Sequence, residues 1–381
     1  MSEEMFAGGF EFDGFRARAE SRNEADQEWL REFLCPQFTP VDPAGADCVV
    51  RFSQDPDRCV RVLGERERAG ERIIDCFALD QQIVRLPSWI GPDGVARVVD
   101  DKFHSIYLLR SATDIEIVAS TRRRGPRIPA MRVLREYAMN HSLTSGRLFV
   151  HGSSVALGDA GIVIAGPSGA GKTTFLMHLL SLGDTEFISN DRVLVREDPS
   201  GIQLTGMPAI VTLRSTTLDL HPTLRERLVM APWNHYRTIR ESEADGKPIR
   251  PWGDGRYGLT PAQFCHLMGV RSRATAEARF VLIPRQTHQP GHITLTALPP
   301  DEVERRLLGA IFGIGCWEHE TNVFALPGDR TVIDAEELRR RCRRFAASLP
   351  VFDCALGQNA YEDASATHDL LARLARNPLH V

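Results

Sequence analysis

A glycine-rich stretch of this 381-residue chain has the residue types and spacing of a phosphate-binding loop. Residues 166–173 read G-P-S-G-A-G-K-T and fit the pattern G-x-x-x-x-G-K-[ST]. Glycines let backbone N–H groups approach phosphate oxygens, and the positive end of the following helix attracts the same anions. Lys172 is suited to neutralise charge on the β- and γ-phosphates of ATP. The stretch therefore predicts nucleotide binding.

The loop residues have distinct expected roles. The Thr173 hydroxyl is the expected Mg²⁺ ligand, and Thr174 either shares this role or is a structural helix residue. His178, farther along the same helix, is expected to pack or to lie at the surface. The residues expected to contact the nucleotide are Gly166, Pro167, Ser168, Gly169, Ala170, Gly171, Lys172, Thr173 and Thr174.

Lysine is rare in this chain, which argues against a chance match to the loop pattern. Only Lys102, Lys172 and Lys247 occur, so the other 43 of the 46 basic residues are arginine. One of these three lysines stands where a compact ammonium group must reach between phosphates, a place that a broad guanidinium would not fit.

An acidic residue follows the loop at a spacing suited to metal binding. Magnesium needs at least one carboxylate beyond the loop, and the stretch "FISNDRVLV" after the loop helix supplies Asp191. The predicted metal ligands are therefore Thr173 and Asp191. A typical P-loop ATPase has four apolar residues directly before its acid, whereas Ser189 and Asn190 intervene here. Hydrogen-bonding groups near the γ-phosphate are what an acceptor molecule would need for its orientation.

A histidine precedes the loop. His151 in "LFVHGSSVAL" is expected at the end of a predicted strand next to the strand "GIVIAG". If the two strands pair as a hairpin through "GDAG", His151 comes near the phosphates. It could then assist proton transfer or bind a phosphate. A hydrogen-bonded structural histidine is the alternative.

The elements that must position these residues are mixed α/β from about Arg147 onward. Strands are predicted in "GIVIAG", "EFISNDRVLVRED", "IQLTGMPAIVTLR", "ARFVLIPR" and "VFDCAL", and helices in "PDEVERRLLGAIFGIG", "AEELRRRCRRFAASLP" and "ATHDLLARLARN". The stretch "AMRVLREYAMNHSL" has helical spacing and is expected to end near Ser145. The basic run "TRRRGPRIP" is expected to be a solvated linker, with a phosphate-contacting patch as the alternative.

The N-terminal part has a different pattern. Residues 1–45 are predicted to be partly helical ("RNEADQEWLREFL") and then rich in turns. Short β-like runs fill residues 47–121. We therefore predict a β-rich domain at residues 1–127 and a P-loop domain at residues 128–381. The first could capture a peptide by strand addition or could simply support the second.

The stretch from "LFVHGSSVAL" through the loop to "ISNDRVLV" resembles the catalytic core of the HPr kinase/phosphorylase family. That family has a strand ending in His-Gly, a G-x-S-G-x-G-K loop and a strand with paired acids. The resemblance covers residues 147–214 and, more weakly, "SLPVFDCALGQN". It implies an α/β (α+β) fold with a mixed-sheet P-loop kinase core, related to the phosphoenolpyruvate carboxykinases. The part of the chain before this core shows no such resemblance.

The resemblance implies roles by position. Asp191 matches the second acid of the family's pair, which makes it the candidate catalytic base, together with His151 and Lys172 as the other catalytic residues. Asn190 replaces the first acid and cannot act as a base. Thr174 and "TGMPAIVTLR" replace features of the bifunctional enzymes. Phosphorylase activity and control of sugar uptake are therefore not expected. Family members often form oligomers, which makes a homo-oligomer an expectation here too.

Further residues are candidates for phosphate or acceptor binding. The stretch 252–256 ("WGDGR") is expected to be a loop that closes over the acceptor. The run "CWEHETN" is rejected as a metal site, because its consecutive residues Glu318, His319 and Glu320 cannot easily converge on one ion. Arginines that could reach the phosphates are Arg214, Arg237, Arg240, Arg250 and Arg256.

Composition limits the class of protein. The formal net charge of −4 gives no indication of nucleic-acid or anionic-membrane binding, and no apolar run approaches the roughly 20 residues of a bilayer span. The eight cysteines form no C-x-x-C pair, and the acidic N-terminus lacks a signal pattern. A cytoplasmic location is expected.

The function predicted from these features is an ATP- and Mg²⁺-dependent kinase that phosphorylates a hydroxyl. The acceptor is a Ser or Thr of a peptide or protein, or a small metabolite. A nucleotide-binding ATPase or switch protein is an alternative, but the water-positioning residue it would need is not evident. A degenerate pseudokinase is a third alternative, since Asn190 has replaced an acid.

Overall fold

The computed structural model describes residues 5–66, 70, 72–79, 82–120, 125–167, 169–199, 201–219, 221–230, 256–287, 289–314, 324, 333–362 and 364–376. The chain divides into two compact units, one built mainly from residues 1–145 and the other mainly from residue 146 onward. The division follows Ser145, whereas the boundary predicted from the sequence falls after residue 127. None of the described helices is both long enough and apolar enough to cross a bilayer.

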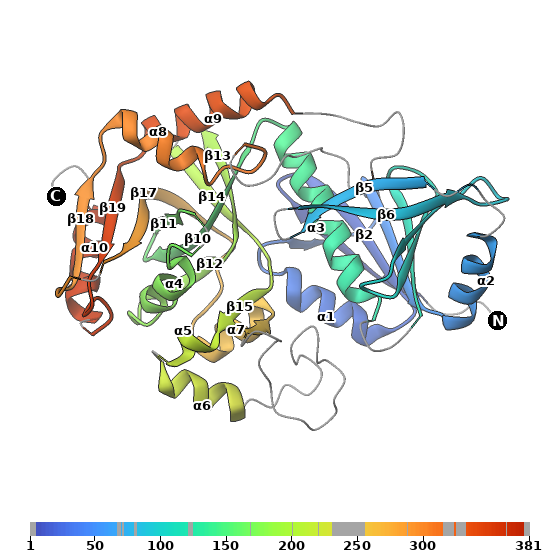
Figure 1. The fold of residues 1–381 in the computed structure, drawn as a ribbon, viewed down its shortest axis with the longest axis horizontal. Coiled ribbons are helices and arrows are strands. Elements are labelled where there is room, and N and C mark those ends of the chain that lie inside the picture. The colour runs from blue at the N-terminus through green and yellow to red at the C-terminus, as the bar shows by residue number, and fades with distance from the viewer. Residues whose placement is uncertain are drawn as a thin grey trace. The chain divides into compact units, whose positions relative to one another are not determined.

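The first unit contains a nine-stranded sheet in the order β3-β1-β2-β4-β9-β8-β7-β6-β5 (Figure 1). Its elements are β1 (Phe6–Phe12), β2 (Phe15–Ser21), α1 (Glu24–Leu34), β3 (Thr39–Val41), β4 (Cys48–Gln54), α2 (Pro56–Arg66), β5 (Arg72–Leu79), β6 (Gln82–Ile90), β7 (Ala96–Asp100), β8 (Ser105–Leu109), β9 (Asp114–Ala119) and α3 (Arg127–Thr144). Residues 47–121, where short β-like runs were predicted, contain the strands β4 to β9 and the helix α2.

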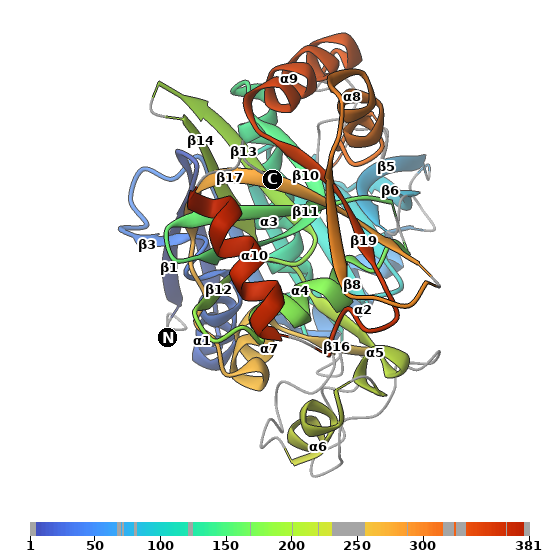
Figure 2. The same ribbon diagram turned by 90° about the vertical axis from the view of Figure 1, so that its left-hand side faces the viewer.

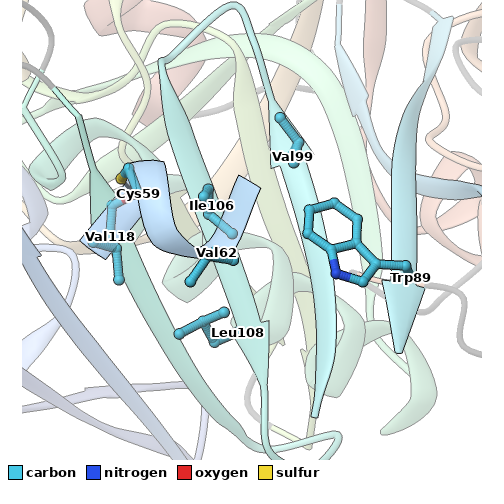
Figure 3. Close-up of a cluster of buried hydrophobic side chains, with 7 residues drawn as sticks. All are labelled: Cys59, Val62, Trp89, Val99, Ile106, Leu108 and Val118. Atoms are coloured by element: carbon cyan, nitrogen blue, oxygen red, sulfur yellow. Dashed lines mark hydrogen bonds between the residues drawn. The ribbon is translucent and has the colours of Figure 1, made fainter. Parts of the chain in front are cut away.

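Three parts of this unit differ from the sequence-based expectation. The strands β1 and β2 form a hairpin, joined at Asp13 and Gly14, whose φ angles of 47° and 84° suit a tight turn of the type I′ kind. The helix α2 interrupts the run of predicted strands. It packs Cys59 and Val62 onto Trp89 and other apolar side chains of β6 to β9, as Figure 3 shows. The predicted linker is also helical from Arg127 onward.

The second unit contains an eight-stranded mixed sheet and carries the predicted site (Figure 2). Its elements are β10 (Leu148–Leu157), β11 (Ala160–Ala165), α4 (Lys172–Leu180), β12 (Thr185–Ser189), β13 (Arg192–Asp198), β14 (Gly201–Met207), β15 (Val211–Arg214), α5 (Ser215–Asp219), α6 (Pro222–Met230), β16 (Arg256–Leu259), α7 (Pro261–Met268), β17 (Thr275–Gln286), β18 (Ile293–Ala297), α8 (Pro300–Leu308), α9 (Ala335–Ser348), β19 (Val351–Leu356) and α10 (Ala364–Arg376).

Five strands of the second unit close into a ring. The order β11-β10-β13-β14-β17 returns to its start because β17 also pairs with β11, in parallel. The strand β19 continues the sheet beyond β17, again in parallel. Every residue of β11 is buried, and so are nine of the ten residues of β10. The carboxyl ends of β11, β17 and β19 therefore lie along one edge, and the loop that follows β11 begins at this edge.

The loop after β11 has the backbone that its sequence predicts. Gly166, Gly169 and Gly171 have φ angles of 149°, 83° and 91°, a region that residues with a Cβ adopt rarely. The helix α4 begins at Lys172 and packs on β10, β11 and β12. Its positive end therefore points at the loop. Ser168 lies outside the described residues.

Candidate active site

The predicted hairpin between β10 and β11 is formed, and it fixes His151 beside the loop. Gly152 stands opposite Ala165, the last residue of β11, so His151 lies at the edge where the loop begins. The sequence suggested that His151 ends its strand. In the structure it is the fourth residue of β10, which continues to Leu157. Gly152 allows the close strand approach, because a Cβ there would lie 2.6 Å from the Ile164 carbonyl oxygen.

The turn that carries Asp191 is tied to the same strand. Asn190 and Asp191 lie between β12 and β13, at the strand end predicted for them. The Gly152 N–H donates to the Asp191 carbonyl oxygen at 3.0 Å, and the Ser153 hydroxyl donates to the Asn190 carbonyl oxygen at 2.9 Å. The Ser189 hydroxyl donates to the Arg192 carbonyl oxygen at 2.7 Å. The first two bonds hold the turn against the strand of His151, and the third closes the turn itself.

His151 and Asp191 meet through their side chains. The His151 Nε2 lies 3.5 Å from the Asp191 Oδ1. The histidine side chain is 14% exposed and the carboxylate 35%, so solvent or a ligand reaches the acid more easily. Burial lowers the pKa of His151, the Asp191 carboxylate raises it, and the positive charges of Lys172 and Arg192 lower it further. The net direction is downward, which favours the neutral imidazole at neutral pH.

Lys172 is buried at the loop, with its ammonium group turned inward. Its Nζ donates to the carbonyl oxygens of Gly166 at 2.7 Å and Pro167 at 3.0 Å. An ammonium group held across the loop in this way is already oriented towards the space that the loop encloses. Its positive charge is one of the groups that lower the pKa of His151.

Two residues of the site were missed from the sequence. The Arg192 Nε lies 3.5 Å from the Asp191 Oδ2, on the other carboxylate oxygen from the one that faces His151. The Arg192 guanidinium lies 5.3 Å from the centre of the Phe312 ring, and the His151 ring centre is 6.0 Å from the same phenyl group. The signal for Arg192 was its place directly after Asp191, whereas Phe312 follows α8 and gives no local signal.

The other predicted residues are placed as follows. The Asn190 Nδ2 donates to the Ile210 carbonyl oxygen at 3.3 Å, a backbone-supporting role. Thr173 is half-buried, and the Thr174 hydroxyl lies 3.5 Å from that of Thr217, which fits a structural position. Arg214 ends β15 with an exposed side chain, and no described contact joins it to the site. The remaining predicted positions lie outside the described side chains: Arg237, Arg240, Arg250, residues 252–255, Arg256, Glu318, His319 and Glu320.

The donor set can be compared with what Mg²⁺ requires. Within the described residues, no group of three or more His, Cys, Asp or Glu side chains converges on one point. Magnesium on a nucleotide usually takes only one or two carboxylates and otherwise binds phosphates and water. One hydroxyl, that of Thr173, and one partly exposed carboxylate, that of Asp191, fit this requirement.

Comparisons with known proteins give a distant structural similarity. No protein-family model matches the sequence, and no curated protein matches it. Among solved structures, the chain is similar to the HPr(Ser) kinase/phosphatase from Coxiella burnetii, with 10% sequence identity over 60% of this chain and 89% of that one, and a TM-score of 0.25. We therefore derive the function from the side chains of this site.

Proposed function

We propose that the chain is an ATP- and Mg²⁺-dependent kinase, which transfers the γ-phosphoryl group to a hydroxyl of a peptide, a protein or a small metabolite. The observation that carries this proposal is the His151–Asp191 pair, 3.5 Å apart at the edge where the phosphate loop begins. A carboxylate in that place can take a proton from an acceptor hydroxyl. A site that only binds phosphate would not require a carboxylate in that place.

In the proposed reaction, the loop and Lys172 hold the triphosphate. The acceptor oxygen attacks the γ-phosphorus, the bond to the β–γ bridging oxygen breaks, and ADP leaves. The acceptor proton passes to Asp191. Neutral His151 orients the Oδ1 of this carboxylate, and Arg192 faces its Oδ2. Charge spreads over the transferring group in the transition state, so the fixed positive charge of Lys172 stabilises it.

Thr173 and Asp191 would hold the magnesium ion. When bound, Mg²⁺ neutralises charge on the β- and γ-phosphates. The acceptor proton can still pass to Asp191, since each of its two carboxylate oxygens offers more than one lone pair.

The test is an assay with purified protein and γ-labelled ATP, first alone and then with serine-containing peptides, hydroxylated metabolites and cell extract. We expect acid-stable label on an acceptor hydroxyl and release of ADP. Asp191→Asn and Lys172→Met should each reduce the transfer by roughly a hundredfold or more, as for other removed catalytic groups. Asp219→Asn, at an exposed carboxylate on α5, is the matched control.

Other results would contradict the proposal in distinct ways. Release of inorganic phosphate at the same rate with and without acceptors would identify an ATPase. Tight ATP binding without turnover under every acceptor condition would identify a pseudokinase. Transfer that is unaffected by Asp191→Asn would remove the carboxylate from the mechanism.

A further inference from the structure

The strand that carries the phosphate loop has a neighbour on each side, and only one of them belongs to the site described above. The strand β10 brings His151 to the loop and lies on one side of β11. The strand β17 runs parallel to β11 on the other side and ends at Gln286. The loop is therefore flanked by the His151–Asp191 pair on the side of β10 and by the end of β17 on the other.

Gln286 lies directly against the loop. A Cβ added to Gly171, the residue before α4, would come within 2.9 Å of the Gln286 Nε2. The same Nε2 donates to the Tyr361 hydroxyl at 3.0 Å. Tyr361 follows β19, which is the next parallel strand, so its place at this edge has the same topological origin. An amide group and a phenol thus stand together beside the first turn of α4.

This pair has a firm support behind it. The Tyr361 ring packs edge-on against the His178 ring of α4, with ring centres 5.2 Å apart. The His178 Nε2 is 3.1 Å from the Thr367 hydroxyl of α10. Burial lowers the pKa of His178 to about 4, so the support is neutral near pH 7. Side chains that are held by packing in this way can define one orientation of a ligand.

We propose that Gln286 and Tyr361 form the subsite for the nucleoside of the triphosphate, an inference that rests on the proposed function. The transferring phosphoryl must face His151 and Asp191, so the opposite end of the nucleotide leaves the loop on the side of β17. Gln286 is exposed and uses one amide hydrogen on Tyr361, which leaves its carbonyl oxygen and its second amide hydrogen for a base or ribose. The Tyr361 hydroxyl keeps its own hydrogen as a donor.

The test compares two ligands that differ only in the nucleoside. Titration calorimetry in the presence of Mg²⁺ measures the affinity of the full chain for ATP and for inorganic tripolyphosphate. Gln286→Ala and Tyr361→Phe should each weaken ATP binding by about tenfold, the size expected for one lost hydrogen bond, and tripolyphosphate binding by less than about twofold. Gln54→Ala, at an exposed glutamine that also ends a strand, here β4, is the matched control and should change neither affinity.

The possible results separate this inference from the proposed function. Equal weakening of both ligands by Gln286→Ala would show that the residue supports the loop, and no weakening of ATP would show that the nucleoside binds elsewhere; either result overturns the subsite. Wild-type protein that binds tripolyphosphate as tightly as ATP would also overturn it, with phosphate binding intact. Wild-type protein that binds neither ligand would overturn the proposed function, and the subsite with it.

Discussion

The His151 Nε2 lies 3.5 Å from the Asp191 Oδ1, although the glycine-rich loop after β11 and the whole of α4 separate the two residues in the sequence. Their backbones are joined as well, because the N–H of Gly152 donates to the Asp191 carbonyl oxygen at 3.0 Å. The two side chains are therefore positioned by the pairing of strands rather than by a flexible loop. Such rigid placement is what a group that takes a proton in a reaction requires.

We expect His151→Ala to reduce kcat by about tenfold to a hundredfold, because Asp191 loses the group that orients it. His151→Gln should recover part of this loss, since an amide can still donate to the carboxylate. The KM for ATP should change little in both variants. Steady-state kinetics measures kcat and the KM for ATP of both variants. His266→Gln, on α7, is the control. A large rise in KM at constant kcat would instead assign His151 to nucleotide binding.

Thr173 and Thr174 form a matched pair of adjacent hydroxyls for testing metal binding. Thr173→Val should raise the Mg²⁺ concentration needed for half-maximal transfer by roughly tenfold, because one oxygen ligand is lost. Thr174→Val should leave it within about twofold, since the Thr174 hydroxyl lies 3.5 Å from Thr217 in a structural contact. Titration of the rate with Mg²⁺ measures both values. The reverse order of effects would place Thr174 on the metal.

Gly152→Ala should destabilise the protein by roughly 1–3 kcal/mol, as overpacking of a tight contact does. The reason is that the new Cβ would lie 2.6 Å from the Ile164 carbonyl oxygen. Gly64→Ala should instead increase the stability of the protein, because this glycine lies in α2 with open space around it. There alanine stabilises a helix by about 0.5–1 kcal/mol. Chemical denaturation measures both changes, and equal signs would contradict the prediction.

Stability should fall as the pH drops below about 6.5, partly because of His178. Its pKa is about 4 in the folded protein, against 6.5 for the ordinary group, so between these values the unfolded chain binds a proton that the folded protein does not. From pH 7.5 to pH 5.5 this group should cost about 1 kcal/mol of the free energy of unfolding. His178→Gln should lose less stability than the wild type over that range. An identical loss in both proteins would contradict the assignment.

The sequence was most informative where local patterns determine the structure. The loop glycines, α4 and the hairpin that brings His151 to the loop were all predicted, because each depends on residues close together in the chain. Gln286 and Tyr361 were not, since they reach the loop only through the parallel pairing of β11, β17 and β19. No local pattern encodes such a pairing.

The errors in the first unit have physical reasons too. The helix α2 was read as part of a strand region, although it is amphipathic and its buried residues Cys59 and Val62 lie three positions apart, on one face of a helix. Its stability comes from packing on the sheet. The Asp13–Gly14 turn carried a usable signal for the β1–β2 hairpin, namely the Asp-Gly pair between alternating apolar residues.

The ring of five strands bears on when the site can form during synthesis. The strand β11 precedes the loop, but its second edge is covered only by β17, which ends at Gln286. A nascent chain that has passed the loop and Asp191 still exposes the unpaired edge of β11, and such edges are prone to wrong pairing. The ribosome must therefore continue from Asp191 through Gln286 before the ring can close around the phosphate loop.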